Sequence, residues 1–150
     1  MNMNKKFKLQ KVLDVREIIE MEKMKNLAFS RKELELEKQR MRKLENEIRQ
    51  LAFEMNESGT ATVCRFSGFH DYLNTLAGML YEKRHAIFVL KKAVEEKRQD
   101  LLQASKDKKV LELLKEKTRT AFAMEENREE QKVLDELAIR TINSYQDEMT

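Results

Sequence analysis

Apolar residues in the first half of this chain recur every seven positions. One column of the repeat consists of residues seven apart, namely Leu27, Leu34, Met41, Ile48 and Met55. Leu44 and Leu51 supply the second column. An apolar stripe with this period keeps facing a partner helix and winds the pair into a left-handed supercoil. The repeat therefore predicts a coiled-coil helix over about residues 5–56.

The second half carries the same repeat. Its main column consists of Leu73, Leu80, Ile87, Val94 and Leu101. Leu76, Leu90 and Ala104 belong to the other column, which Lys83 and Lys97 interrupt, much as Glu20 interrupts the seam of the first half. The phase shifts over residues 103–108, where we expect a stutter. A second helix is predicted over about residues 69–147.

Small, β-branched and glycine residues separate the two repeats. This composition predicts a turn at about residues 57–68, with Ser67 or Gly68 capping the second helix. Two helices joined by so short a connection fold back on each other. The predicted fold class is therefore all-α: a long antiparallel two-helix coiled-coil hairpin forming a single domain over residues 1–150.

Composition favours long helices and little else. The chain contains no proline, three glycines and 38% charged residues, so helix breakers are nearly absent. The single cysteine cannot form an internal disulfide, and the longest apolar run, Ala86 to Leu90, is too short to span a bilayer. We expect a cytoplasmic protein without a membrane anchor.

The predicted helices differ in length. Pairing outward from the turn places Leu13 opposite the neighbourhood of Leu111, so residues beyond about Lys115 should lack a partner. Charge is also uneven, because residues 83–119 hold twelve basic and six acidic side chains, whereas residues 125–150 hold three and eight. We expect the acidic tail to be a docking element.

Few side chains suggest chemistry. Cys64, His70 and His85 lack the spacing of metal ligands, and a hairpin offers no pocket for a Cys–His nucleophile, so we expect no catalytic, cofactor or metal site. The acidic residues of the first helix should form ion pairs on its solvated surface: Glu33, Glu35, Glu37, Glu45 and Glu47.

Two other functions remain open. Basic pairs such as Lys91 and Lys92 would suit a nucleic-acid-binding coiled coil, although Glu95 and Glu96 lie within the next turn. A generic adaptor is the other alternative. Aromatic residues gather near the predicted turn, where they form either a partner site or turn packing: Phe66, Phe69, Tyr72, Tyr81 and Phe88.

The chain resembles the flagellar export protein family FliJ. The likeness begins at residues 7–16, includes the heptads and the aromatic segment at Tyr72 and Leu73, and is most specific in the tail. The tail residues that carry it are Glu126, Asn127, Arg128, Gln131, Lys132, Asp135, Glu136, Ala138 and Arg140.

The resemblance implies a stalk similar to the central shaft of rotary ATPases, one that binds and stimulates the hexameric flagellar export ATPase. It also implies binding to the export-gate membrane protein and to export chaperones, with neither nucleic-acid binding nor direct membrane insertion. Such a protein would be non-enzymatic and cytoplasmic, lying peripherally at the inner face of the cell membrane.

The resemblance also suggests contact residues. Those expected to contact the ATPase ring are Leu13, Arg16, Arg128, Gln131, Lys132, Asp135, Glu136 and Arg140. Those expected to contact the export gate are Tyr72, Leu76, Met79 and Lys83.

Overall fold

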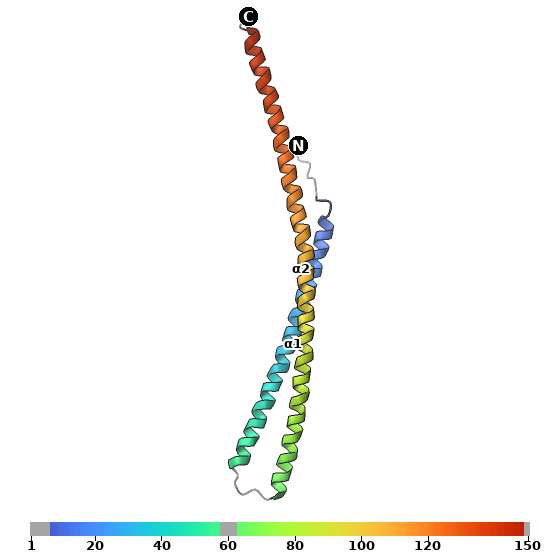
Figure 1. The fold of residues 1–150 in the computed structure, drawn as a ribbon, viewed down its shortest axis with the longest axis vertical. Coiled ribbons are helices and arrows are strands. Elements are labelled where there is room, and N and C mark those ends of the chain that lie inside the picture. Colours follow the sequence, from blue (N-terminus) through green and yellow to red (C-terminus); the bar gives the residue numbers. More distant parts are fainter. Residues whose placement is uncertain (1–6, 58–62, 149–150) are drawn as a thin grey trace. The chain divides into compact units, whose positions relative to one another are not determined.

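A computed structural model describes residues 7–57 and 63–148 of the chain, with side chains for 7–57 and 66–144. These residues form two α-helices, α1 (Gln10–Glu57) and α2 (Val63–Glu148), and no strand (Figure 1). The two helices pack against each other as an antiparallel hairpin, which confirms the predicted fold class.

The helix bounds differ from the predicted ones mainly at the turn. α1 starts five residues later than predicted and ends at Glu57, one residue past the predicted end. α2 starts at Val63, so Ser67 and Gly68 lie inside the helix and the predicted cap is wrong. A glycine inside a helix costs only about 1 kcal/mol relative to alanine, which is small beside the backbone hydrogen bonding of an 86-residue helix. Residues 58–62 of the predicted turn lie outside the described residues.

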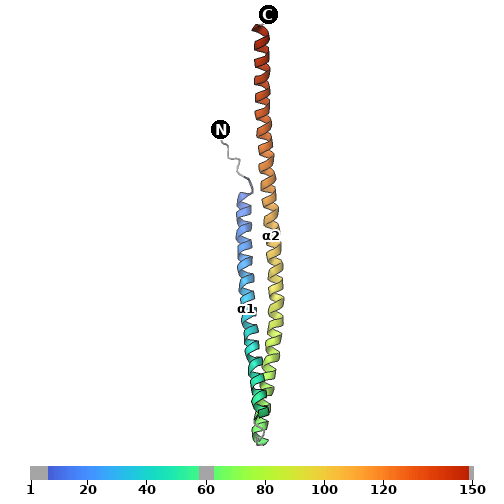
Figure 2. The ribbon, with the colours of Figure 1, turned by 90° about the vertical axis from the view of Figure 1, so that its left-hand side faces the viewer.

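The described residues divide into two compact units. The first comprises residues 18–57 and 63–105, where α1 and α2 lie side by side and run in opposite directions (Figures 1 and 2). Its buried apolar residues all occupy predicted column positions: Leu27, Leu44, Leu76, Ile87 and Ala104. The seven-residue repeat thus identified the interhelical seam correctly.

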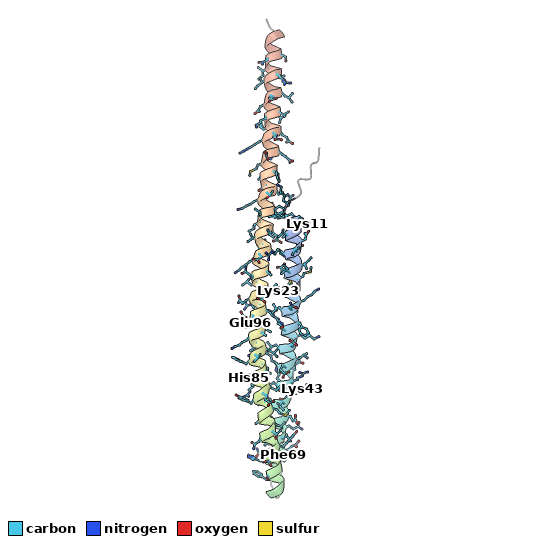
Figure 3. All side chains as sticks on the ribbon, turned by 90° about the vertical axis from the view of Figure 1, so that its right-hand side faces the viewer. Lys11, Lys23, Lys43, Phe69, His85 and Glu96 are labelled. Carbon is cyan, nitrogen blue, oxygen red and sulfur yellow. The ribbon has the colours of Figure 1, made fainter. Side chains whose placement is uncertain are left out.

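The seam is narrow. Side chains surround both helices (Figure 3), and most of those outside the two column positions are exposed. Large apolar residues such as Phe29, Phe53 and Tyr81 are among them, with exposed fractions of 62%, 63% and 76%. A two-helix unit buries one stripe per helix, so its outer faces remain available to partners.

The second unit comprises residues 7–17 and 106–148. Leu13 is buried in it, and Arg16 Nη1 lies 3.2 Å from Asp107 Oδ2. This ion pair agrees with the predicted pairing of Leu13 with the neighbourhood of Leu111. Half-buried residues continue along α2 to Phe122, somewhat beyond the predicted Lys115, and every described side chain from 123 to 144 is exposed.

Candidate contact surfaces

The four predicted gate residues lie on successive turns along one side of α2, but they differ in how far they are buried. Tyr72 and Met79 are exposed, each at 46%, whereas Leu76 is 3% exposed and lies in the interhelical seam. Leu76 therefore supports this segment from inside, and only the first two side chains present an apolar outer surface.

The hydroxyl of Tyr72 is bound to the opposite helix. It donates a hydrogen bond of 3.0 Å to Glu47 Oε1, and this bond raises the pKa of the phenol because the acceptor carboxylate favours the protonated form. The bond fixes the exposed ring beside α1.

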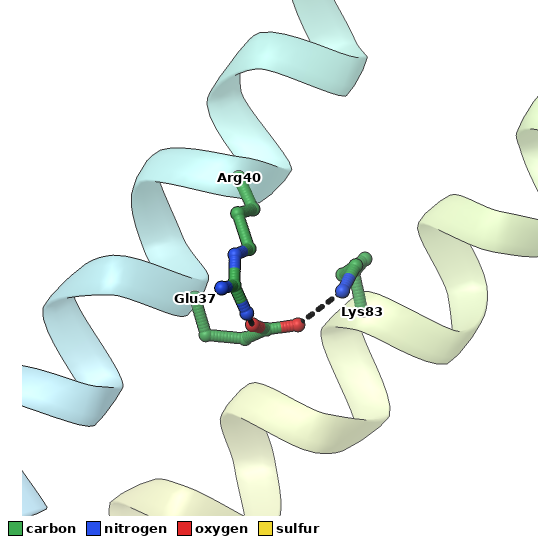
Figure 4. A network of polar contacts seen from close by, with 3 residues as sticks. All are labelled: Glu37, Arg40 and Lys83. Carbon is green, nitrogen blue, oxygen red and sulfur yellow. Dashed lines mark hydrogen bonds and ion pairs between the residues drawn. The ribbon is translucent and has the colours of Figure 1, made fainter.

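The fourth gate residue, Lys83, belongs to a three-residue network in the seam (Figure 4). Its Nζ donates to Glu37 Oε1 at 2.5 Å, and Arg40 Nη1 donates to Glu37 Oε2 at 3.0 Å. The hydrogen bond from Lys83 is the main reason why the pKa of the Glu37 carboxyl is lowered, with Arg40 adding to it against the effect of burial. Placing Glu37 on the solvated surface was therefore wrong.

The other two interruptions of the seam are also paired across it. Lys97 Nζ donates to Ser30 Oγ at 2.5 Å, and Ser105 Oγ donates to Glu20 Oε1 at 2.6 Å. The seven-residue repeat identified one member of each pair, as a polar residue at an apolar column position. The missing partners Glu37 and Ser30 lie seven and fourteen residues before Leu44, so extending that column toward the N-terminus would have found them.

Two further acids of the first helix also face α2. Glu45 Oε1 lies 3.6 Å from Arg84 Nη2, and Glu47 accepts the bond from Tyr72. Glu33 and Glu35 are exposed, and Glu35 lies 3.9 Å from Arg42 of its own helix. The solvated-surface interpretation therefore holds for these two residues and not for Glu37.

The predicted ring-contact residues fall into two groups, both in the second unit. Leu13 is buried, and Arg16 is partly exposed and paired with Asp107. The remaining residues lie on the exposed part of α2: Arg128, Gln131, Lys132, Asp135, Glu136 and Arg140. Of these, Gln131 and Asp135 are bound to each other, with Nε2 donating to Oδ1 at 2.9 Å.

Apolar side chains accompany the charged ones on this part of α2. Large apolar residues that are more than half exposed are Met124, Val133, Leu134, Leu137, Ile139 and Ile142. Glu129 and Glu130 flank Val133 and Leu134 around a shallow hollow. Apolar and charged side chains are thus mixed around this exposed part of α2.

The residues considered for chemistry are not gathered. His70 and His85 are exposed on α2 (His85 is labelled in Figure 3), and the side chain of Cys64 lies outside the described set. Within residues 7–57 and 63–148, no group of three His, Cys, Asp or Glu side chains is placed to hold a metal ion. In the same residues, neither helix has a stretch apolar enough to cross a membrane.

The aromatic residues near the start of α2 mostly point outward. Phe66, Tyr81 and Phe88 are more than half exposed, and Phe69 is half-buried. Lys92 Nζ lies 4.6 Å from the centre of the Phe88 ring, a cation–π contact. Phe69 is thus partly covered, and the other rings are accessible.

Comparison with known proteins gave one match. A family model described as flagellar FliJ protein matches residues 5–146, which is nearly the whole chain. No curated protein and no solved structure is significantly similar to it. The match spans the aromatic start of α2, both helices and the exposed tail.

Proposed function

Because the chain belongs to the flagellar FliJ family, and is thus a component of the flagellar export apparatus, we propose that it is the stalk of the export ATPase. It binds and stimulates the hexameric ATPase and links it to the export gate and the export chaperones. It acts by binding alone, in the cytoplasm at the inner face of the cell membrane.

The observation that carries this proposal is the exposed end of α2. Residues 123–144 form more than six helical turns on which every side chain is exposed. A lone helix of this length is marginal in water, and a partner that covers its apolar side chains would stabilise it. The predicted ring-contact residues from Arg128 to Arg140 lie within this segment.

The charge of this segment suits a reversible contact. Arg128, Lys132 and Arg140 are its basic residues, and they stand among a larger number of acids. Exposed ion pairs are individually worth about 0–1 kcal/mol, so a mixed-charge surface can bind a ring without becoming locked in one position.

The gate contact is assigned to Tyr72 and Met79. Both are exposed about two turns apart on the same side of α2, and Tyr72 is held by its bond to Glu47. Leu76 and Lys83 act through the structure, because the first is buried in the seam and the second pairs with Glu37. The exposed rings of Phe66, Tyr81 and Phe88 lie on another side of α2, since Tyr81 is two and a half turns from Tyr72, and they offer a separate apolar surface for chaperones.

Stimulation of the cognate export ATPase tests the proposal. The variant combines Arg128→Glu with Lys132→Glu, and we expect its half-maximal stimulating concentration to rise at least about tenfold through lost charge contacts. The matched control combines Lys43→Glu with Lys91→Glu, two exposed lysines outside the tail. Equal stimulation by variant and wild type would contradict the assignment of the tail to the ring.

A further inference from the structure

Helix α1 carries a second regular stripe, distinct from the seam. Its residues are spaced alternately by four and three positions, and all are exposed: Ile18, Glu22, Lys25, Phe29, Lys32 and Leu36. We call this set the outer stripe. Alternating spacings of four and three keep side chains on one face of a helix over several turns, as in a coiled-coil seam.

The outer stripe faces away from α2. Ile18 and Leu36 are eighteen residues apart, which is five helical turns, so they lie on the same face. Leu27 is midway between them, two and a half turns from each, and therefore lies on the opposite face. Because Leu27 is 5% exposed within the seam, the outer stripe lies on the solvent side of the first unit.

The charged residues of the outer stripe have no ion pairs. In the described part of the chain, Glu22, Lys25 and Lys32 take part in none. Charged residues on the seam side of α1 do form ion pairs. Lys23 Nζ lies 3.7 Å from Asp100 Oδ2, and Glu37 pairs with Lys83. The apolar members are equally uncovered, with exposed fractions of 60% for Ile18, 62% for Phe29 and 45% for Leu36.

Two copies of the outer stripe are complementary to each other when the helices that carry them run antiparallel. Its spacing of four, three, four, three and four reads the same in both directions, with a centre beside residue 27. Two antiparallel copies would place Ile18 opposite Leu36, Glu22 opposite Lys32, and Lys25 opposite the ring of Phe29. These are an apolar pair, an ion pair and a cation–π pair, each formed twice.

We propose that the outer stripe is the interface of an antiparallel dimer formed with a second copy of this chain. The interface uses no residue assigned above to the ATPase ring or the export gate, so it goes beyond the proposed function. Six residues per copy bury less area than the ~1,200–2,000 Å² of a stable interface. The dimer is therefore weak and depends on protein concentration.

Sedimentation equilibrium of the full chain over a range of concentrations tests the apolar part of the interface. Phe29→Ser is expected to weaken dimerisation at least about tenfold, because two aromatic anchors are lost per dimer. Phe53→Ser is the matched control, since Phe53 is equally exposed on the same helix but lies off the stripe. Its dimerisation should match the wild type.

Charge exchange tests the pairing. Glu22→Lys alone and Lys32→Glu alone each create two like-charge pairs per dimer and should weaken dimerisation about tenfold. The double variant restores opposite charges and should recover wild-type dimerisation to within about threefold. Glu96→Lys, on an exposed acid of α2 labelled in Figure 3, is the control for net charge and should have no effect.

Cross-linking tests the direction. In a Cys64→Ser background, a mixture of the Ile18→Cys and Leu36→Cys proteins should form a mixed disulfide faster than either protein forms a disulfide alone. Circular dichroism is the control for folding, and each variant is expected to be folded because the changes are at exposed positions. A chain that is monomeric at all concentrations, a dimer unaffected by Phe29→Ser, or a double charge variant as weak as the single ones would overturn the proposal.

Discussion

At the scale of single residues, the seam is defined by polar side chains that pair across it. Glu37 is buried and accepts bonds from both Lys83 and Arg40, and Ser30 accepts one from Lys97. A buried charge that loses its partner costs much more than the intact pair contributes. The effect of a substitution here therefore depends on whether one partner or both are replaced.

Replacing Glu37 by Gln should destabilise the hairpin at neutral pH. The change leaves Lys83 without its carboxylate, at an expected cost of about 1–2 kcal/mol in the free energy of unfolding. The measurement is urea unfolding followed by circular dichroism. Glu33→Gln is the matched control, since Glu33 is exposed on the same helix.

The pH dependence of that difference follows from the lowered pKa of Glu37. In the unfolded chain this carboxyl titrates near 4.5, and in the folded chain it titrates at lower pH. The stabilisation by Glu37 is therefore fully present above the unfolded pKa and is lost as the pH falls through the folded pKa. The gap between wild type and Glu37→Gln should shrink as the pH falls from the unfolded pKa through the lower folded pKa, and a gap that widened on acidification would contradict the ion pair.

Substitutions of Leu76 and Met79 distinguish a residue that stabilises the hairpin from one that contacts the export gate. Leu76→Ala removes a buried side chain and should lower the free energy of unfolding by about 2–3 kcal/mol. Met79→Ala changes an exposed side chain and should alter it by less than about 0.5 kcal/mol. If Met79 contacts the gate and Leu76 supports it from inside, as proposed, only Met79→Ala weakens binding to the gate's cytoplasmic domain without changing stability. If both variants bind the gate as tightly as wild type does, this segment does not contact the gate.

At the scale of the helices, sequence periodicity predicted the buried seam of each helix, but it missed the start of α2 and the partner of Lys83. The columns through Leu27 and Leu73 predicted the buried face of each helix, because a seam of period seven leaves few alternatives. The start of α2 was missed, because Gly68 and the β-branched residues some positions before it have low helix propensity, which is a weak preference that the rest of the helix overrides. Glu37 was missed because a surface ion pair and a seam ion pair use the same residue types.

Replacing a whole polar layer should have the opposite effect to replacing half of it. Glu37→Leu combined with Lys83→Leu fills the layer with the residue type found at Leu44 and Leu76. We expect the double variant to be more stable than wild type by about 1–3 kcal/mol, because no charge remains to be desolvated. Thermal unfolding measures this. A double variant less stable than wild type would mean that the layer holds the helices together more strongly than leucines do.

At the scale of the whole molecule, the sequence indicated the family and the type of function but only part of each contact surface. The tail residues from Arg128 to Arg140 could be predicted as accessible, because α1 is too short to cover them. Leu76 and Lys83 stand at positions of the second column, so the repeat already separated them from Tyr72 and Met79. The exposure of Tyr72 and Met79, and the bond that holds Tyr72 to Glu47, come from the structure.

The central claim is that the end of α2 binds the export ATPase, and a truncation tests it most directly. A chain ending at Met124 keeps the paired parts of both helices and lacks only side chains that are exposed in the described structure. Its affinity for the cognate ATPase hexamer is compared with that of the full chain, with thermal unfolding as the control for folding. We predict that affinity falls at least about tenfold while the unfolding of the hairpin is unchanged. Undiminished binding by the truncated chain would contradict the claim.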